Sequence, residues 1–278
     1  MNYRHAFHAG NFADVFKHAL LLALLDQLAA KEKPLCYFET HAGAGRYGLE
    51  DPQAEKTGEW NDGIGRLFSL TNLPQSLRPY VDAIRAFNRG GTLRVYPGSP
   101  LLATNALRGG DRIVLCESQA DEARKLRSLF RDDARVHVHQ RDGYAALKAL
   151  LPPSERRGLV LVDPPFEQQA QEFRVIETAL AEAHARWPTG VYAIWYPIKQ
   201  RSAVRPFERW LDERGWRNVL VVELLVRADD SPLRLNGCGM AIVNAPWRLD
   251  AMLGEMLPGL SALLAQAKGA THRLRTLS

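Results

Sequence analysis

The segment Asp163-Pro164-Pro165-Phe166 combines residue types that can act on an amino group attached to a nucleobase. Such an amine is a poor nucleophile, because its lone pair is delocalised into the aromatic ring. The Asp163 carboxylate and the Pro164 carbonyl can both accept its hydrogen bonds, which orients and polarises the nitrogen. Proline has a fixed φ and no N–H, which helps to aim that carbonyl. The Phe166 ring offers a stacking face for an extruded base, worth about 1–3 kcal/mol. The alternative is a plain turn at a strand end, where Asp and Pro are common.

Other acidic residues, like Asp163, stand at or just after the end of an apolar run that is expected to form a strand. Glu39 and Glu117 end two apolar runs, Asp142 with Gly143 follows a third, and Asp163 follows a fourth. In an open parallel sheet, ligands bind beyond the carboxyl ends of the strands. An acid there can accept hydrogen bonds from ribose hydroxyls or from an exocyclic amine, and a glycine lets a ligand approach the backbone. The pattern therefore predicts a site for a nucleoside-containing cofactor.

A glycine motif follows the first of these runs. Gly43, Gly45 and Gly48 match the G-x-G-x-x-G fingerprint of dinucleotide-binding folds. A nicotinamide cofactor would require a ribose-binding acid about 20 residues later, at the end of the next strand. Here the next acid at a strand end is Glu117, so that interpretation lacks its usual support. A tight turn that packs a helix on the sheet is the simpler alternative.

The elements that must position these residues follow from the apolar pattern. Strands alternate with helices, which predicts an α/β fold with a parallel sheet covered on both faces. The expected strands are 35–39, 112–117, 136–139, 159–162 and 191–196, and the expected helices are 11–31, 99–108, 120–131, 168–186 and 201–214, with one more after 143. Residues 219–226 and 240–244 are expected to close the sheet as a hairpin-like pair, and the tail 266–278 to be loosely ordered.

Helix ends and one insertion complete this organisation. Asn11 followed by Asp14 resembles a capping box, and Ser99 with Pro100 suits an N-cap and N1 pair. Residues 50–94 show helical stretches and no convincing strand, which predicts a small helical insertion after the first strand. We expect residues 1–278 to form a single domain that contains this insertion.

Composition excludes several classes of protein. The 278 residues carry a net charge of +5, which permits a polyanionic partner without establishing one. The longest apolar run, 19–25, is far shorter than the roughly 20 residues of a membrane span. The N-terminus lacks the features of a signal peptide. The three cysteines lack metal-like spacing, and His5 and His8 lack a third ligand. We expect a soluble cytoplasmic protein without a metal site.

The motif at Asp163 is similar to the (Asp/Asn/Ser)-Pro-Pro-(Tyr/Phe) signature of S-adenosylmethionine-dependent amino-methyltransferases. The chain as a whole resembles one family, the RlmJ-type 23S rRNA adenine-N6 methyltransferases, over nearly its full length. The segments that carry this likeness are Tyr3-Arg-His-x-Phe-His-Ala-Gly-Asn11, Ala13-Asp14-Val15, Lys17-His18, Thr40-His-Ala-Gly-Ala-Gly-Arg-Tyr47, Tyr96-Pro-Gly-Ser-Pro100, Arg156-Arg-Gly158 and Trp195-Tyr-Pro197.

The resemblance implies a Rossmann-like methyltransferase sheet, S-adenosylmethionine as cofactor, and direct methyl transfer to adenine N6 in 23S rRNA, naked or in an assembly intermediate. The implied catalytic residues are Asp163, Pro164 and Phe166. The implied cofactor-binding residues are His18, His41, Ser99, Glu117, Asp142, Gly143 and Asp163. Tyr3 would lie near the RNA. The family pattern has Tyr where this chain has Phe166, so a hydroxyl hydrogen bond is lost while stacking remains.

Several of these positions also have simpler interpretations. His18 lies on an amphipathic helix, where a histidine is often a packed residue, and Ser99 could serve only as a helix cap. Lys199 and Arg201 follow the fifth strand at the edge of the predicted site, so we expect them to meet RNA phosphates. The alternative is a solvated helix face.

Three other functions remain open from the sequence. They are a DNA adenine-N6 methyltransferase, a nicotinamide-dependent oxidoreductase favoured only by the glycine motif, and a non-catalytic rRNA-binding assembly factor favoured by the basic charge. We expect a monomer that needs no metal and no covalent enzyme intermediate, because a sulfonium is already a good leaving group.

Overall fold

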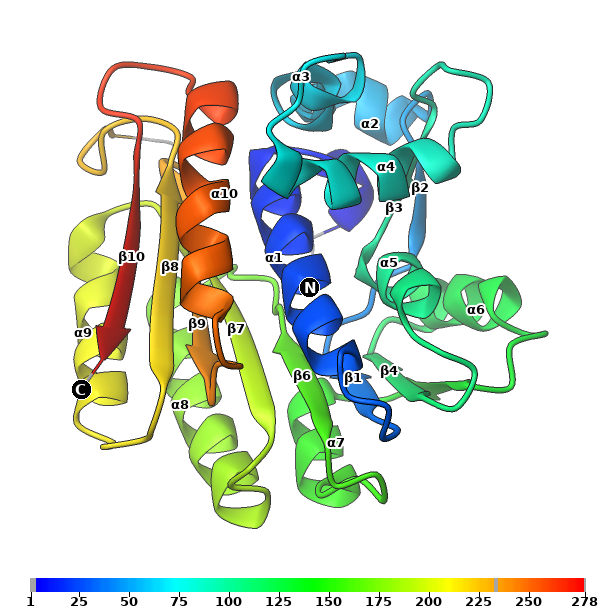
Figure 1. The fold of residues 1–278 in the computed structure, drawn as a ribbon, viewed down its shortest axis with the longest axis vertical. Helices are drawn as coiled ribbons and strands as arrows, with labels where there is room; N and C mark the ends of the chain where they lie inside the picture. The colour runs from blue at the N-terminus through cyan, green and yellow to red at the C-terminus, as the bar shows by residue number, and fades with distance from the viewer. Residues whose placement is uncertain (1–3, 233–234, 278) are drawn as a thin grey trace.

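The computed structural model describes residues 4–232 and 235–277. Figure 1 shows its helices and strands. The helices are α1 (Phe12–Ala29), α2 (Pro52–Thr57), α3 (Ile64–Phe68), α4 (Arg78–Ala86), α5 (Ser99–Ala106), α6 (Ala120–Leu129), α7 (Gly143–Leu150), α8 (Gln169–Arg186), α9 (Arg201–Asp212) and α10 (Leu249–Leu264). The strands are β1 (Cys36–Glu39), β2 (Arg46–Gly48), β3 (Val95–Pro97), β4 (Arg112–Glu117), β5 (Val136–Gln140), β6 (Gly158–Val162), β7 (Val191–Ile198), β8 (Val219–Leu225), β9 (Gly237–Val243) and β10 (Thr271–Leu277).

Eight strands form one sheet in the order β10-β8-β9-β7-β6-β1-β4-β5. The five strands from β5 to β7 are parallel, as the alternation of strands and helices predicts. The pair β8 and β9 is antiparallel, which confirms the expected closing pair, and β9 lies between β7 and β8. Because β1, β4 and β6 are parallel neighbours, their carboxyl ends meet at one edge of the sheet.

Helices cover both faces of the sheet. Helices α1, α5 and α10 lie on one face, where their apolar side chains form a core with the sheet (Figure 1). Helices α7, α8 and α9 cover the other face and form a second core. None of the helices built from the described residues is both long and apolar enough to cross a membrane.

Helix α1 begins where the capping pattern predicts. The Asn11 side chain accepts hydrogen bonds from the backbone N–H groups of Ala13 and Asp14, both at 3.0 Å. Because α1 is apolar nearly all round, most of its first fourteen residues are buried, and the helix packs against α5, α10, α4 and the sheet. The helix thus brings its polar N-terminal residues to the carboxyl edge of the sheet.

The insertion is helical, as expected. It contains α2, α3 and α4 and lies at the upper edge in Figure 1, above the N-terminus of α1. Its buried apolar residues, including Ile64, Leu67 and Ile84, belong to the same core as α1. Strand β2 precedes the insertion and β3 follows it, and the two strands pair antiparallel with each other. Neither of these two short strands was among the strands expected from the sequence.

Two further expectations were wrong. Gly98, not Ser99, is the N-cap of α5, and the Ser99 hydroxyl donates a hydrogen bond to the buried Glu39 carboxylate instead of accepting one from the first turn of the helix. The tail is also not loosely ordered, since β10 pairs along its whole length with β8.

Candidate active site

A cavity of about 750 Å³ opens at the carboxyl edge of the sheet. Residues from the N-terminus of α1, the loop after β1, the end of β4, the segment after β6 and the insertion line it. Asp163 and Glu117, predicted from their places at strand ends, both lie in this lining. The structure therefore brings these two acidic strand ends to one cavity, whereas Glu39 and Asp142 are not among its described lining residues.

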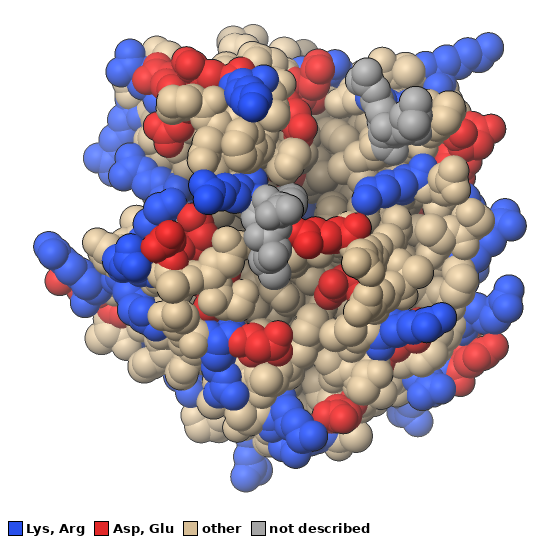
Figure 2. All heavy atoms as spheres, turned by 180° about the vertical axis from the view of Figure 1, so that it is seen from behind, with Lys and Arg blue, Asp and Glu red and all other residues tan. Residues whose placement is uncertain are grey.

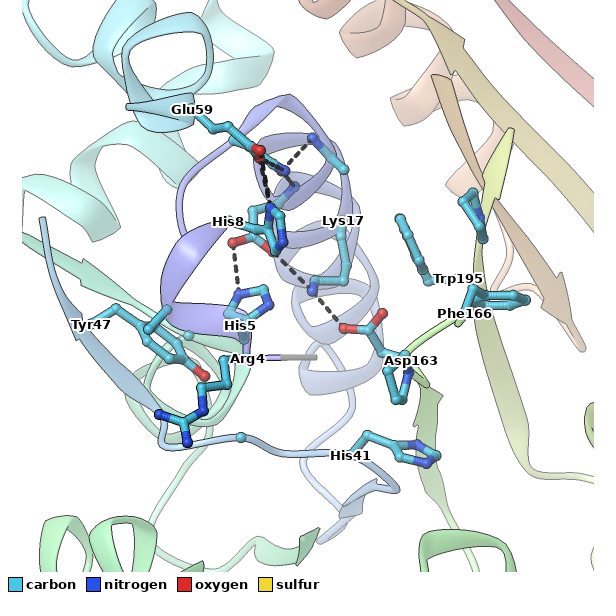
Figure 3. A pocket seen from close by; sticks show the side chains of 18 of the residues that line it. Arg4, His5, His8, Lys17, His41, Tyr47, Glu59, Asp163, Phe166 and Trp195 are labelled. Carbon is cyan, nitrogen blue, oxygen red and sulfur yellow. Dashed lines mark hydrogen bonds and ion pairs between the residues drawn. The ribbon is translucent and has the colours of Figure 1, made fainter. Parts of the chain in front are cut away.

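Asp163 is held by a lysine from the other end of the chain. Lys17 Nζ lies 2.5 Å from Asp163 Oδ2 and 2.9 Å from Asp14 Oδ1. In Figure 3 the Lys17 side chain points from α1 toward Asp163. His5 Nε2 lies 3.0 Å from the other oxygen of Asp14, Oδ2. Sequence reasoning gave Lys17 no role, because nothing local connects it with a residue 146 positions later.

Asp14 is buried, and its charge is balanced by its neighbours. Burial alone would raise the pKa of Asp14, but His5 and Lys17 hold it well below its ordinary value. Its Oδ2 also accepts a hydrogen bond from the backbone N–H of Gly10. Asp14 is thus an ionised anchor that holds Lys17 in reach of Asp163.

Glu117 connects β4 with the glycine loop. Its carboxylate accepts hydrogen bonds from the backbone N–H groups of Gly43, at 2.9 Å, and Gln119, at 2.7 Å. Gly43 has φ +61°, in the left-handed region, which explains the glycine at this turn. Burial raises the pKa of Glu117. A carboxylate has about four acceptor positions, so Glu117 can also accept hydrogen bonds from a ribose.

Asp142 and Gly143 have structural contacts at the start of α7. Asp142 caps this helix by accepting a hydrogen bond from the N–H of Ala145. A Cβ on Gly143 would lie 2.1 Å from the carbonyl oxygen of Thr40, so only glycine permits this approach. Neither residue belongs to the described lining of the cavity. Their assignment to the adenine side of a cofactor stays a prediction.

The three other predicted cofactor residues all line the cavity. His18 is buried, its Nδ1 lies 2.7 Å from the Tyr96 hydroxyl, and burial lowers its pKa to about 3. His41 Nδ1 lies 2.8 Å from Thr40 Oγ1, and its enclosed position lowers its pKa to about 4. Both imidazoles are therefore neutral at pH 7. Ser99 is held by its hydrogen bond to Glu39.

Phe166 borders the cavity but is only 8% exposed. Its ring makes edge contacts with Phe173 and Trp195, at centroid distances of 5.3 and 5.8 Å. Figure 3 shows the ring directed away from Asp163. Little of the ring is therefore open for a base to stack on, and this role of Phe166 stays a prediction.

The predicted RNA contacts fall into three groups. Tyr3 lies outside the described residues. Lys199 is exposed and lines the cavity, as a phosphate contact would require. Arg201 is already bound by carboxylates, with Glu223 at 2.7 Å and Asp229 at 3.1 Å, so its guanidinium stabilises the fold and we do not assign it to RNA.

The insertion also contributes a residue that sequence reasoning missed. Glu59 accepts hydrogen bonds from His8 Nδ1 and from Asn11 Nδ2, both at 3.0 Å. The hydrogen bond with Glu59 raises the pKa of His8. Because the partners are about 50 residues apart, only tertiary structure reveals this link between the insertion and the start of α1.

The parallel sheet closed by the antiparallel β9, with acidic residues at the ends of β4 and β6 in one cavity, is typical of a Rossmann-like methyltransferase. The family model described as "Ribosomal RNA large subunit methyltransferase D, RlmJ" matches residues 32–275, and the chain belongs to this family.

Two curated relatives are named "Ribosomal RNA large subunit methyltransferase J". The one from Escherichia coli is 42% identical over 98% of this chain and 96% of its own length. The one from Haemophilus influenzae is 43% identical over 95% of this chain and 94% of its own length. A crystal structure of a Legionella pneumophila protein superposes with a TM-score of 0.89, at 36% identity, over 98% of this chain and 99% of that one.

Proposed function

We propose that this protein transfers a methyl group from S-adenosylmethionine to N6 of an adenine in 23S rRNA. The observation that carries the proposal is the Asp163 carboxylate, which lies in the cavity at the end of β6 and is held there by Lys17. Membership in the family and the curated relatives support rRNA as the substrate class.

The residues of the cavity fit this cofactor. Glu117 has acceptor positions for a ribose, and Gly43, which lines the cavity, has no side chain that would keep a ligand from the backbone. His18 Nε2 is buried and has no hydrogen-bond partner among the described residues, as expected of a group that binds a ligand. Bound S-adenosylmethionine would supply a methyl group on a sulfonium, which needs no further activation.

The chain's own residues supply positioning and polarisation. Asp163 Oδ1 accepts a hydrogen bond from the target amine, and the Pro164 carbonyl accepts the second. Lys17 binds Oδ2, which fixes the orientation of the carboxylate. The excess proton leaves the nitrogen through Asp163. The cavity holds the cofactor and the target base together in a fixed orientation, which accelerates methyl transfer.

The replacement Asp163→Asn tests the proposal, because it removes the charge and preserves the size. We expect transfer of labelled methyl to a 23S rRNA fragment to fall by at least about 10²-fold. Affinity for S-adenosylhomocysteine, measured by calorimetry, should remain nearly intact. Asp132→Asn, at a carboxylate that is 87% exposed, is the matched control and should change neither quantity.

Three results would contradict the proposal. Undiminished transfer by the Asp163→Asn variant would remove this carboxylate from the mechanism. Methylation of duplex DNA in preference to rRNA would identify the other nucleic acid as the substrate. Tight rRNA binding without any methyl transfer by the unaltered protein would identify a non-catalytic assembly factor.

A further inference from the structure

A chain of three buried rings connects the insertion with the cavity. The hydroxyls of Tyr80 and Tyr96 lie 3.1 Å apart, and the Tyr96 hydroxyl lies 2.7 Å from His18 Nδ1. Tyr80 belongs to α4, Tyr96 to β3 and His18 to α1. All three residues are at most 1% exposed.

The hydrogen bonds in this chain have a preferred direction. The His18 imidazole is neutral, so it has one N–H group and one acceptor nitrogen. A phenol is a stronger hydrogen-bond donor than a neutral imidazole, and the imidazole nitrogen is the stronger acceptor. The opposite direction would leave the Tyr80 hydroxyl hydrogen buried without an acceptor among the described residues. Tyr80 therefore donates to Tyr96, and Tyr96 donates to His18 Nδ1.

This direction places the proton of His18 on Nε2. That atom is buried and has no partner among the residues that the structure describes, whereas the His18 side chain lines the cavity. A buried N–H donor without an acceptor is costly, so its presence indicates a ligand that accepts there. The amino-acid end of the proposed cofactor has one acceptor, its carboxylate, because its ammonium group can only donate.

We propose that Tyr96 and Tyr80 are positioning residues that fix His18 with its proton on Nε2, so that it donates a hydrogen bond to the cofactor carboxylate. This inference rests on the proposed function for the identity of the cofactor. It also gives the helical insertion a role in the cofactor site, because Tyr80 lies on α4.

The protonated nitrogen of His18 is observable in the protein without any ligand. In ¹⁵N-histidine NMR spectra, we expect the unaltered protein to show His18 as a single tautomer with the proton on Nε2. The replacement Tyr96→Phe removes the donor to Nδ1, so the proton should distribute between both nitrogens. The spectrum of His18→Gln assigns the signal.

Calorimetry with two ligands distinguishes a specific effect on the position of His18 from a general loss of protein stability. S-adenosylhomocysteine contains the amino-acid end, and 5′-methylthioadenosine lacks it. We expect Tyr96→Phe to lower the affinity for S-adenosylhomocysteine about tenfold, which corresponds to the loss of roughly one hydrogen bond. The affinity for 5′-methylthioadenosine should stay within about twofold of that of the unaltered protein. Tyr80→Phe should act in the same direction with a smaller loss, of about twofold, because Tyr96 can still donate to His18.

Tyr192→Phe is the matched control, because it also removes a buried hydroxyl, one that donates to the carbonyls of Ala183 and Trp187. It should change neither affinity. Equal losses for both ligands in Tyr96→Phe would show a merely structural role and overturn the inference, as would a His18 signal with its proton on Nδ1. Failure of the unaltered protein to bind either ligand would instead contradict the proposed cofactor, and the NMR result would still decide the tautomer.

Discussion

At the scale of single residues, two buried carboxylates near the cavity differ in their ionisation. Asp14 has cationic neighbours, and its pKa is well below the ordinary value. Glu39 is fully buried at the end of β1, and burial raises its pKa to about 8, although Ser99 and Tyr37 donate hydrogen bonds to it. The folded protein therefore holds a proton on Glu39 at pH values where the unfolded chain has lost it.

This difference predicts a dependence of stability on pH. Because the pKa of Glu39 is raised from 4.5 to about 8, its contribution is present below pH 4.5 and is lost as the pH rises toward 8. The replacement Glu39→Gln keeps the neutral shape. Between pH 5 and pH 8, the unaltered protein should lose up to about 4 kcal/mol of unfolding free energy relative to this variant. Urea denaturation at both pH values measures the difference, and parallel changes in the two proteins would contradict it.

The sequence could predict those site residues whose location follows from their position at the end of a strand. Asp163 and Glu117 each follow an apolar run, and a parallel sheet brings such positions to one edge. Lys17 and Tyr80 could not be predicted in their roles, because their partners are 146 and 16 residues away and no spacing rule joins them. The burial of Phe166 depends on Trp195 from the neighbouring strand, which a local motif does not reveal.

At the scale of elements, β10 shows why a polar tail can still be ordered. Its sequence has no apolar alternation, so no strand was expected. Arg273 on β10 binds Glu223 on β8, at 2.9 Å, and Glu208 on α9. Glu223 is also held by Arg201 and by the Tyr196 hydroxyl. Ion pairs with buried carboxylates thus replace the apolar contacts that sequence patterns detect.

These contacts predict unequal effects for two neighbouring arginines. Arg273 and Arg275 have similarly exposed side chains, 38% and 43%, but Arg273 binds both Glu223 and Glu208, whereas Arg275 binds Glu208 at 3.2 Å. The replacement Arg273→Met should lower the unfolding free energy by about 2 kcal/mol, because it leaves buried carboxylates short of a donor. Arg275→Met should cost less than about 1 kcal/mol. Equal losses in urea denaturation would contradict the role of the buried pair.

The other elements were predictable where an apolar run was long enough. Strands β4 and β6 and helix α8 were expected nearly within their observed bounds. Strands β2 and β3 have three residues each, too few for a recognisable alternation. Strand β9 begins at Gly237, earlier than expected, because glycines do not resemble strand residues. A Cβ on Gly239 would lie 2.3 Å from the Tyr196 ring, so close packing explains that glycine.

At the scale of the whole molecule, charge is spread over the surface. The net charge is +5, and the face in Figure 2 shows lysine and arginine side chains mixed with acidic ones. Such a surface gives weak attraction to any polyanion. Selective RNA binding must therefore depend on basic residues placed at the cavity, and Lys199 is one that is exposed there.

The salt dependence of RNA binding distinguishes a lysine that contacts a phosphate from the general effect of the protein's net charge. Each lysine that neutralises a phosphate adds roughly one unit to the slope of log affinity against log salt concentration. Lys199→Ala should reduce that slope by about one for an rRNA fragment. Lys33→Ala makes the same change in net charge on an exposed residue before β1, at the opposite edge of the sheet, and should leave the slope nearly unchanged. Fluorescence anisotropy over a series of salt concentrations measures both. If the two variants lowered the slope equally, RNA would respond to the total charge of the protein, and Lys199 would have no particular place in the complex.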